Sequence, residues 1–205
     1  MAQLSATLFL TLDGVYQAPG GPEEDTTGGF DLGGWLAPLV DEDFGAFVDE
    51  NFRHPTAFLL GRRTYEIFAS YWPKQTDPAD PVAGKLNALP KYVASTTLEN
   101  PEWAGTTVIG REDLAKEVAA LKERTDGEIQ VHGSGAVLGQ LLKQNLVDVL
   151  HLIVAPVVLG KGMRLFGAGT APTAFTLTGS RTTSQGVAIL SYRFAGQPRF
   201  GTVGE

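Results

Sequence analysis

The sequence contains no cysteine, and its three histidines (His54, His132 and His151) lie far apart along the chain. The absence of cysteine excludes disulfides, thiolate metal sites and a cysteine nucleophile, and it fits a reducing cytoplasm. The histidines do not show the short spacings that are typical of metal-ligand sets. We therefore expect no metal site.

Basic residues and long hydrophobic runs are also scarce. The formal net charge is −7, whereas a protein that coats nucleic acid needs a basic face to displace counterions. The N-terminal stretch MAQLSATLFLTLDG lacks a charged leader, and threonines interrupt its apolar run, which argues against a signal peptide or a membrane span. These features predict a soluble, cytoplasmic protein with no nucleic-acid or membrane partner.

The chain of 205 residues is long enough to bury one sizeable core, and it has no internal repeat or low-complexity tract. Nothing in its composition requires a second domain. We expect a single domain over residues 1–195, followed by a short C-terminal tail over residues 196–205.

Apolar segments with the period of strands alternate along the chain with segments that have the period of helices. Expected strands cover residues 4–12, 56–60, 91–95, 106–109, 128–132 and 147–159, and a hairpin follows over residues 175–181 and 187–194. Expected helices begin after Asp41, after Gly61, at Arg111 and after the glycine turn at residues 133–135. The pattern predicts an α/β fold, with a mostly parallel central sheet, helices on both faces and a C-terminal antiparallel hairpin.

Two segments rich in glycine or proline interrupt this pattern. Residues 15–35 contain eight glycines or prolines, which predicts a long loop, either a lid over a site or a disordered insertion. Residues 72–89 contain three prolines, which predicts a surface loop with at most one short helical turn.

Residues 128–145, EIQVHGSGAVLGQLLKQN, have the pattern of a strand, a Gly133-Ser134-Gly135 turn and a helix. The free backbone N–H groups and the positive end of the helix then face outward together, which favours an anion such as phosphate. The same small residues also suit an ordinary strand-to-helix turn that binds nothing. From this stretch alone, both interpretations stay open.

An ordered set of motifs resembles the dihydrofolate reductase-like family. The motifs are TLDG, GRRTYE, KYVASTTL, VHGSGAVLGQLL, LVDVLHL and APVVLGKGMRLF, with the C-terminal hairpin after them. The last three are similar to the branch that includes the reductase domain of bacterial riboflavin biosynthesis proteins. The resemblance covers most of the chain and implies a dihydrofolate reductase-like three-layer fold, NADPH as the cofactor and a homodimer.

The resemblance also implies a set of cofactor contacts. Arg62 matches an arginine that approaches the adenosine 2′-phosphate, and a guanidinium at a helix start suits a phosphate. The implied cofactor-binding set is Gly61, Arg62, Thr64, Ser95, Thr96, Gly133, Ser134, Gly135, Ala136 and Val137. Each of these residues also has an ordinary structural interpretation, as a surface arginine, a strand-end polar residue or a turn residue.

On the substrate side, Asp43 lies near the acidic residue that dihydrofolate reductases carry at the start of their second helix. A carboxyl group in an apolar pocket can have a raised pKa and assist protonation. Asp43 also suits the dipole of a helix's first turn with no catalytic role. Phe47 matches an aromatic residue that faces the substrate, and the other candidates flank the expected lid: Asp13, Tyr16 and Trp35.

The leading hypothesis is an NADPH-dependent reductase that transfers hydride to a C=N or C=O bond of a small, pterin-like or pyrimidine-like substrate. Lys161 and Arg164 are candidates to contact a substrate phosphate. Two alternatives stay open: a protein on the same scaffold that binds NADPH or a small ligand without turnover, and an interaction domain in which each glycine turn is only a turn. His132 has no assigned role.

Overall fold

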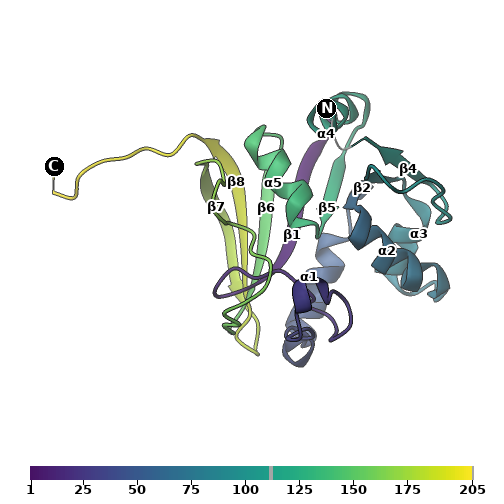
Figure 1. Ribbon diagram of the computed structural model, residues 1–205, viewed down its shortest axis with the longest axis horizontal. Helices are drawn as coiled ribbons and strands as arrows, with labels where there is room; N and C mark the ends of the chain where they lie inside the picture. The colour runs from purple at the N-terminus through teal and green to yellow at the C-terminus, as the bar shows by residue number, and fades with distance from the viewer. Residues whose placement is uncertain (111–112, 205) are drawn as a thin grey trace.

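The computed structural model describes residues 1–110 and 113–204 (Figure 1). In this part of the chain, eight strands form one sheet in the order β4-β3-β2-β5-β1-β6-β8-β7. The strands from β4 to β6 in this order are parallel, and β8 and β7 add an antiparallel edge. The strands are β1 (Gln3–Thr11), β2 (Pro55–Gly61), β3 (Lys91–Ala94), β4 (Thr106–Ile109), β5 (Glu128–His132), β6 (Val149–Ala155), β7 (Ala174–Thr182) and β8 (Ala188–Gly196). The predicted α/β fold with its C-terminal hairpin is confirmed.

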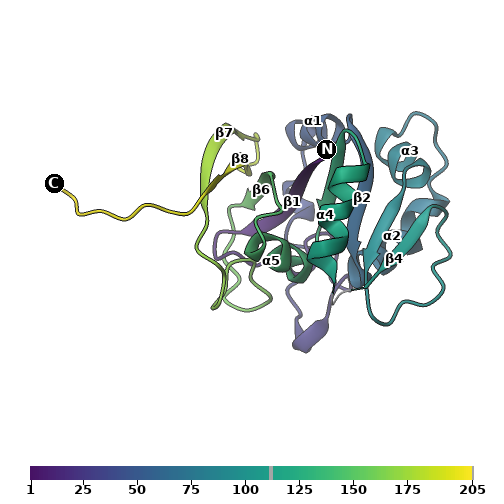
Figure 2. The ribbon, with the colours of Figure 1, turned by 90° about the horizontal axis from the view of Figure 1, so that it is seen from above.

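Helices cover both faces of this sheet (Figure 2). One face carries α1 (Glu42–Asn51), α2 (Arg62–Tyr71) and α3 (Pro81–Ala88), and the other carries α4 (Leu114–Arg124) and α5 (Gly135–Lys143). The expected start of α4 at Arg111 lies outside the described residues. None of the helices in the described ranges has the length and apolar character needed to cross a membrane.

Strand β1 lies inside the sheet, between β5 and β6, and its two rows of side chains enter different layers. Successive strand residues point to opposite faces. One row joins the core under α4 and α5: Leu4, Ala6, Leu8 and Leu10. The other row is mostly polar: Ser5, Thr7, Phe9 and Thr11. The layer under α1 therefore contains buried hydroxyl groups close to the ends of the strands.

Side-chain caps define where two of the helices begin. Asp41 accepts a hydrogen bond from the backbone N–H of Phe44 (2.8 Å), which begins α1 as predicted. Ser134 caps α5 by accepting from the backbone N–H of Val137 (3.4 Å). The glycine turn after β5 is therefore part of a helix N-terminus, where the first N–H groups have no partner inside the helix.

Residues 72–89 contain more helix than the sequence predicted. A 3₁₀ turn, η3 (Trp72–Lys74), precedes the eight-residue helix α3. Pro81 occupies the first turn of α3, where its missing N–H needs no partner, and Asp80 accepts hydrogen bonds from two N–H groups of the same turn. The loop prediction was wrong because a proline in this position begins a helix, and because α3 buries its apolar side against β2 and β3.

The long segment at residues 15–35 is packed against the rest of the chain. Val15 and Phe30 belong to a small buried cluster, and Trp35 Nε1 donates a hydrogen bond to the backbone carbonyl of Gln17 (2.8 Å). Such packing does not fit a disordered insertion. The role of this segment as a lid stays a prediction.

Candidate active site

A cavity of about 480 Å³ lies at the carboxyl ends of the central parallel strands. Open α/β sheets bind ligands at this edge, where strand ends and helix N-termini meet. The lining comes from β1, the ends of β2, β3 and β5, the first turns of α2 and α5, and the loop at residues 15–35. Segments that are distant in the sequence therefore share one concave site.

The structure gathers nearly all the cofactor-binding candidates around this cavity. The lining includes Gly61, Arg62, Thr64, Ser95, Thr96, Gly133, Ser134, Ala136 and Val137. Gly135 does not line the cavity, and the Tyr16 ring occupies the space that a side chain at position 135 would need. The three turns that resemble cofactor-binding motifs thus meet in one place, and their binding roles stay predictions.

Two of these turns fit closely together because they contain glycine. Gly133 has a φ of 64°, and a Cβ built on it would lie 2.9 Å from Thr64 Oγ1. The side chain of Ser134 fills the space beside Gly61 in the same manner. Because only glycine permits this approach without overlap, the N-termini of α2 and α5 converge on the cavity with free N–H groups.

The third turn, after β3, is held by the hydroxyl group of Ser95. Ser95 Oγ accepts hydrogen bonds from the backbone N–H groups of Thr97 (3.1 Å) and Leu98 (2.9 Å). This arrangement leaves Thr96 and Thr97 among the residues that line the cavity. The polar character of the turn therefore has a structural cause and also presents hydroxyl groups to the cavity.

Two neighbouring arginines at the start of α2 bring positive charge to the cavity. Arg62 pairs with Glu66 on its own helix (2.7 Å), and their side chains are 46% and 47% exposed. Arg63 pairs with Asp25 in the loop (2.6 Å). Burial alone would raise the pKa of Asp25, but hydrogen bonds from Arg63 and Thr27 outweigh it and hold this pKa below its ordinary value. Since exposed ion pairs contribute little, Arg62 is available to an anionic ligand.

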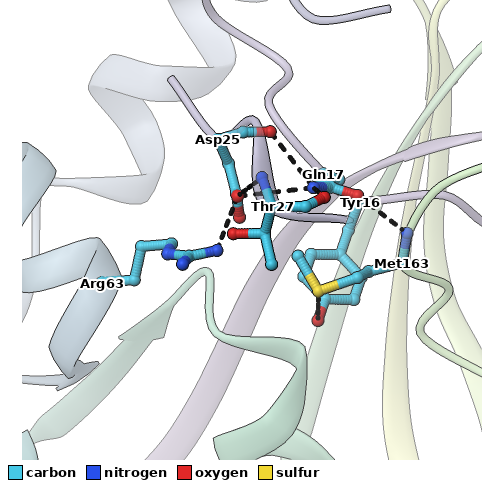
Figure 3. A network of polar contacts seen from close by, with 6 residues as sticks. All are labelled: Tyr16, Gln17, Asp25, Thr27, Arg63 and Met163. Atoms are coloured by element: carbon cyan, nitrogen blue, oxygen red, sulfur yellow. Dashed lines mark hydrogen bonds and ion pairs between the residues drawn. The ribbon is translucent and has the colours of Figure 1, made fainter. Parts of the chain in front are cut away.

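Gln17 organises the loop beside the Arg63–Asp25 pair (Figure 3). Its Nε2 donates to the backbone carbonyls of Asp25 (3.1 Å) and Thr27 (3.0 Å). Its Oε1 accepts from the backbone N–H of Met163 (3.1 Å), in the segment after β6. Sequence reasoning missed this network because its members are far apart along the chain and match no motif.

His132 also lines the cavity, although no sequence motif assigned it a role. We call the part lined by Thr7, Phe9 and His132 the inner end of the cavity. The His132 ring stacks on Phe52 with centroids 4.9 Å apart, and its Nε2 lies 3.0 Å from Gln130 Oε1. Burial lowers the pKa of His132 to about 4, so the ring is neutral near pH 7. Its place at the end of β5, directly before the glycine turn, is the one signal visible in the sequence.

The carboxylate of Asp43 lies away from the cavity. Its Oδ2 accepts a hydrogen bond from the backbone N–H of Ser184 (2.9 Å), in the turn between β7 and β8. Asp41 accepts from the Ser184 hydroxyl (2.7 Å) and from the backbone N–H of Gln185 (2.9 Å). These bonds join the start of α1 to the C-terminal hairpin. The position of Asp43 gives its expected catalytic role no support.

Of the four expected substrate contacts, Tyr16 lines the cavity and the other three do not. Trp35 and Phe47 pack in a hydrophobic cluster between α1 and strands β6 and β8. Phe47 also lies under the Arg181 guanidinium, 5.1 Å from its ring centroid. The structure thus places these two aromatic side chains in the core beside α1.

Asp13 holds the loop after β1 to the segment after β6. A hydrogen bond from the Thr11 hydroxyl (2.6 Å), followed by bonds from backbone N–H groups after β6, keeps the pKa of Asp13 well below its ordinary value. Arg164 pairs with Asp13 (3.0 Å), and Lys161 pairs with Asp31. Neither basic residue lines the cavity. Within residues 1–110 and 113–204, no three His, Asp or Glu side chains lie close enough together to hold a metal ion.

Comparison with solved structures places this fold among known ones. A pyrimidine reductase-like protein from Corynebacterium diphtheriae matches with a TM-score of 0.62 at 15% identity, over 95% of this chain and 92% of that chain. A dihydrofolate reductase from Enterococcus faecalis, complexed with NADP(H), matches with a TM-score of 0.57 at 14% identity, over 94% of this chain and 96% of that chain. At such low identity, these matches show the dihydrofolate reductase-like fold.

Comparison of sequences gives the family. A relative described as uncharacterized protein YyaP, from Bacillus subtilis (strain 168), is 28% identical over 191 residues, which cover 92% of this chain and 93% of the relative. The family model described as the RibD C-terminal domain matches residues 2–189. Because this match spans most of the chain, the chain belongs to the RibD C-terminal domain family.

Proposed function

We propose that this protein is an NADPH-dependent reductase that transfers hydride to a C=N or C=O bond of a small, pterin-like or pyrimidine-like heterocycle. The observation that carries the proposal is the convergence of three polar turns on one cavity, two of which begin the helices α2 and α5. Helix N-termini bind phosphate groups through free N–H groups and the helix dipole. Membership of a reductase family supports the same cofactor.

The side chains around the cavity fit this cofactor. Because Gly133 has no Cβ, its turn can lie close against Thr64, and a pyrophosphate group would meet the N–H groups at the start of α5 beside this contact. Arg62 would pair with the adenosine 2′-phosphate, and the hydroxyl groups of Ser95 and Thr96 would lie on the same side of the cavity. Arg62 therefore provides selectivity for NADPH over NADH.

When bound, the cofactor supplies hydride from its reduced nicotinamide ring. The chain then has to orient a flat substrate and exclude water. The inner end of the cavity offers the ring of Phe9 beside two polar groups, on Thr7 and His132. The loop at residues 15–35 lines the same cavity and would act as its lid. Asp43 stays outside this proposal because its carboxylate bonds to the hairpin.

The proposal extends to a homodimer through the C-terminal hairpin. Strand β7 forms one edge of the sheet and is exposed over most of its length, and Leu177 on this strand is 52% exposed. An exposed edge strand can pair with a second chain. Light scattering on the purified protein distinguishes a dimer from a monomer.

The test of the cofactor assignment is a fluorescence titration of the full chain with NADPH and, in parallel, with NADH. We expect saturable binding of NADPH and weaker binding of NADH. The absence of NADPH binding would contradict the proposal. NADPH binding without oxidation, across a panel of pterins, pyrimidines and quinones, would favour the alternative of a binding protein without turnover.

A further inference from the structure

The His132 ring is held in one orientation before any ligand arrives. Phe52 stacks on it with an interplanar angle of 25°, and Phe58 packs against it with ring centroids 5.7 Å apart. A side chain locked by packing presents its polar atoms at fixed positions. What His132 can recognise therefore depends on which ring nitrogen donates a hydrogen bond and which accepts one.

The proton of the neutral ring lies on Nε2. Gln130 Nε2 donates a hydrogen bond to the backbone carbonyl of Asn51 (2.6 Å), at the C-terminal end of α1. This bond orients the Gln130 amide so that its Oε1 faces His132 Nε2 (3.0 Å). An oxygen acceptor beside Nε2 requires an N–H at that position. Nδ1 then carries a lone pair and no proton.

Nδ1 of His132 is open to the cavity. The His132 side chain lines the cavity, and within the described residues its ring hydrogen bond is made by Nε2. The same residues include no fully buried side-chain nitrogen or oxygen that lacks a partner. Nδ1 must therefore retain contact with open space. A polar atom held in this way is a hydrogen-bonding point for a ligand.

Thr7 lies beside His132 on the neighbouring strand. Residues 7 and 132 are partners in the parallel register of β1 and β5, and both line the cavity. Thr7 Oγ1 accepts a long hydrogen bond from Asn51 Nδ2 (3.4 Å), so its hydroxyl proton can be donated to a ligand. The inner end of the cavity therefore presents an acceptor next to a donor.

We propose that His132 and Thr7 determine substrate specificity by binding the edge of a cyclic amide or ureide, in which a ring N–H lies next to a carbonyl group. His132 Nδ1 accepts a hydrogen bond from the ring N–H, and the Thr7 hydroxyl donates one to the carbonyl oxygen. This assignment rests on the proposed function, because it concerns the ring that would be reduced. His132 orients that ring and takes no part in the transfer of hydride.

The test compares two fluorescent probes that differ in their N–H groups. Lumazine has ring N–H groups next to carbonyls, whereas 1,3-dimethyllumazine keeps the carbonyls and lacks those N–H groups. We expect the wild-type protein to bind lumazine about tenfold more tightly, which is the value of one ordinary hydrogen bond. Equal affinities, or no binding of lumazine, would overturn the proposal.

Two conservative variants separate hydrogen bonding from the added bulk of the methyl groups. His132→Gln keeps a donor toward Gln130 but removes the acceptor at the Nδ1 position. The variant should therefore bind the two probes with about equal affinity. His132→Asn keeps an oxygen acceptor near the Nδ1 position, so the preference should persist. If His132→Gln retained the full preference, a steric origin would replace the proposed hydrogen bond.

Thr7→Val provides a second, independent variant of nearly the same shape. Because both probes keep their carbonyls, this change should weaken both by a similar factor of about five to ten and leave their ratio unchanged. An unchanged affinity for both probes would remove Thr7 from the proposal. Each titration is performed with and without NADPH. A failure to bind NADPH would contradict the proposed function. A failure to distinguish the two probes would contradict only the assignment of His132 and Thr7.

Discussion

Thr64 occupies the space that a side chain on Gly133 would need, since a Cβ at Gly133 would lie 2.9 Å from Thr64 Oγ1. The two residues belong to different strand-to-helix turns, the first at the start of α2 and the second at the end of β5. Their contact fixes the relative position of the two helix N-termini that face the cavity. The glycine thus has a role between two elements as well as within its own turn.

Gly133→Ala should destabilise the protein by about 2 kcal/mol, because alanine is strained at a φ of 64° and would also overlap with Thr64. Chemical denaturation with the unfolding midpoint as readout measures this change. The same variant should weaken NADPH and NADH binding together, because the start of α5 would move.

The matched control is Gly139→Ala, inside the helix α5 that follows the Gly133 turn. A Cβ at Gly139 meets no atom within 4 Å, and alanine favours a helix interior over glycine by about 0.5–1 kcal/mol. We therefore expect Gly139→Ala to raise the unfolding midpoint without changing cofactor binding. Equal losses of stability in the two variants would show that the contact between the turns has no special importance.

Arg62→Ala should raise the Kd for NADPH about 10- to 100-fold and leave the Kd for NADH nearly unchanged. The expected loss corresponds to one charge-assisted hydrogen bond to the 2′-phosphate, which NADH lacks. Arg181→Ala is the control, because Arg181 is similarly exposed (44%) and pairs with Glu50 outside the main cavity. Parallel titrations measure the ratio of the Kd for NADH to the Kd for NADPH. Equal effects of Arg62→Ala on the two cofactors would assign Arg62 to another role.

Asp25→Asn should loosen the loop at residues 15–35, because the ion pair with Arg63 is lost from a side chain that is only 9% exposed. Cleavage after Glu23 or Glu24 by a glutamate-specific protease should become several-fold faster, while the unfolding midpoint changes little. Asp31→Asn removes the same charge from an exposed position in the same loop, with 70% exposure. Similar cleavage rates in the two variants would argue against a special role for the Arg63–Asp25 pair.

His132 should make stability dependent on pH. Its folded-state pKa of about 4 lies below the unfolded value near 6.5, so the unfolded chain binds the extra proton more readily between these values. Neutral His132 therefore makes its full contribution to the free energy of unfolding above pH 6.5. As the pH falls toward 4, this contribution is lost, and the free energy of unfolding decreases by about 3 kcal/mol in total. Denaturation curves at pH 7 and pH 5 measure the loss.

His132→Gln is the control for this pH dependence, because glutamine does not titrate. The variant should lose less stability than the wild type between pH 7 and pH 5. Part of the loss will persist, because burial also lowers the pKa of His151. Identical losses in the two proteins would show that His132 titrates in the same way in the folded and unfolded chains.

The fold was predictable from the sequence because its determinants are local. Strand and helix periods identified the sheet, and Asp41 marked the start of α1 by its capping chemistry alone. The convergence of the glycine turns was also predictable, since parallel strands end at the same edge of a sheet. The helix α3 was missed because Pro81 resembles a loop signal unless its position in the first turn is known.

The residues at the inner end of the cavity could not be predicted, because their positions depend on contacts between segments that are distant in the sequence. The positions of Asp43 and Phe47 follow from how α1 packs against the hairpin and the sheet, and this packing turns both side chains away from the cavity. The chemical character of His132 depends on Gln130 and on the end of α1, which is distant in the sequence. The spacing of residues along the chain does not predict such contacts.

The place of β1 between β5 and β6 has a consequence for how the chain folds as it is synthesised. The first strand pairs on one side with residues 128–132 and on the other with residues 149–155. Its pairing with β5 must therefore wait until residue 132 has left the ribosome, and its pairing with β6 until residue 155 has done so. Such distant pairing makes folding slow and leaves the waiting chain open to aggregation, so the nascent protein is expected to depend on chaperones more than a helical protein of equal length.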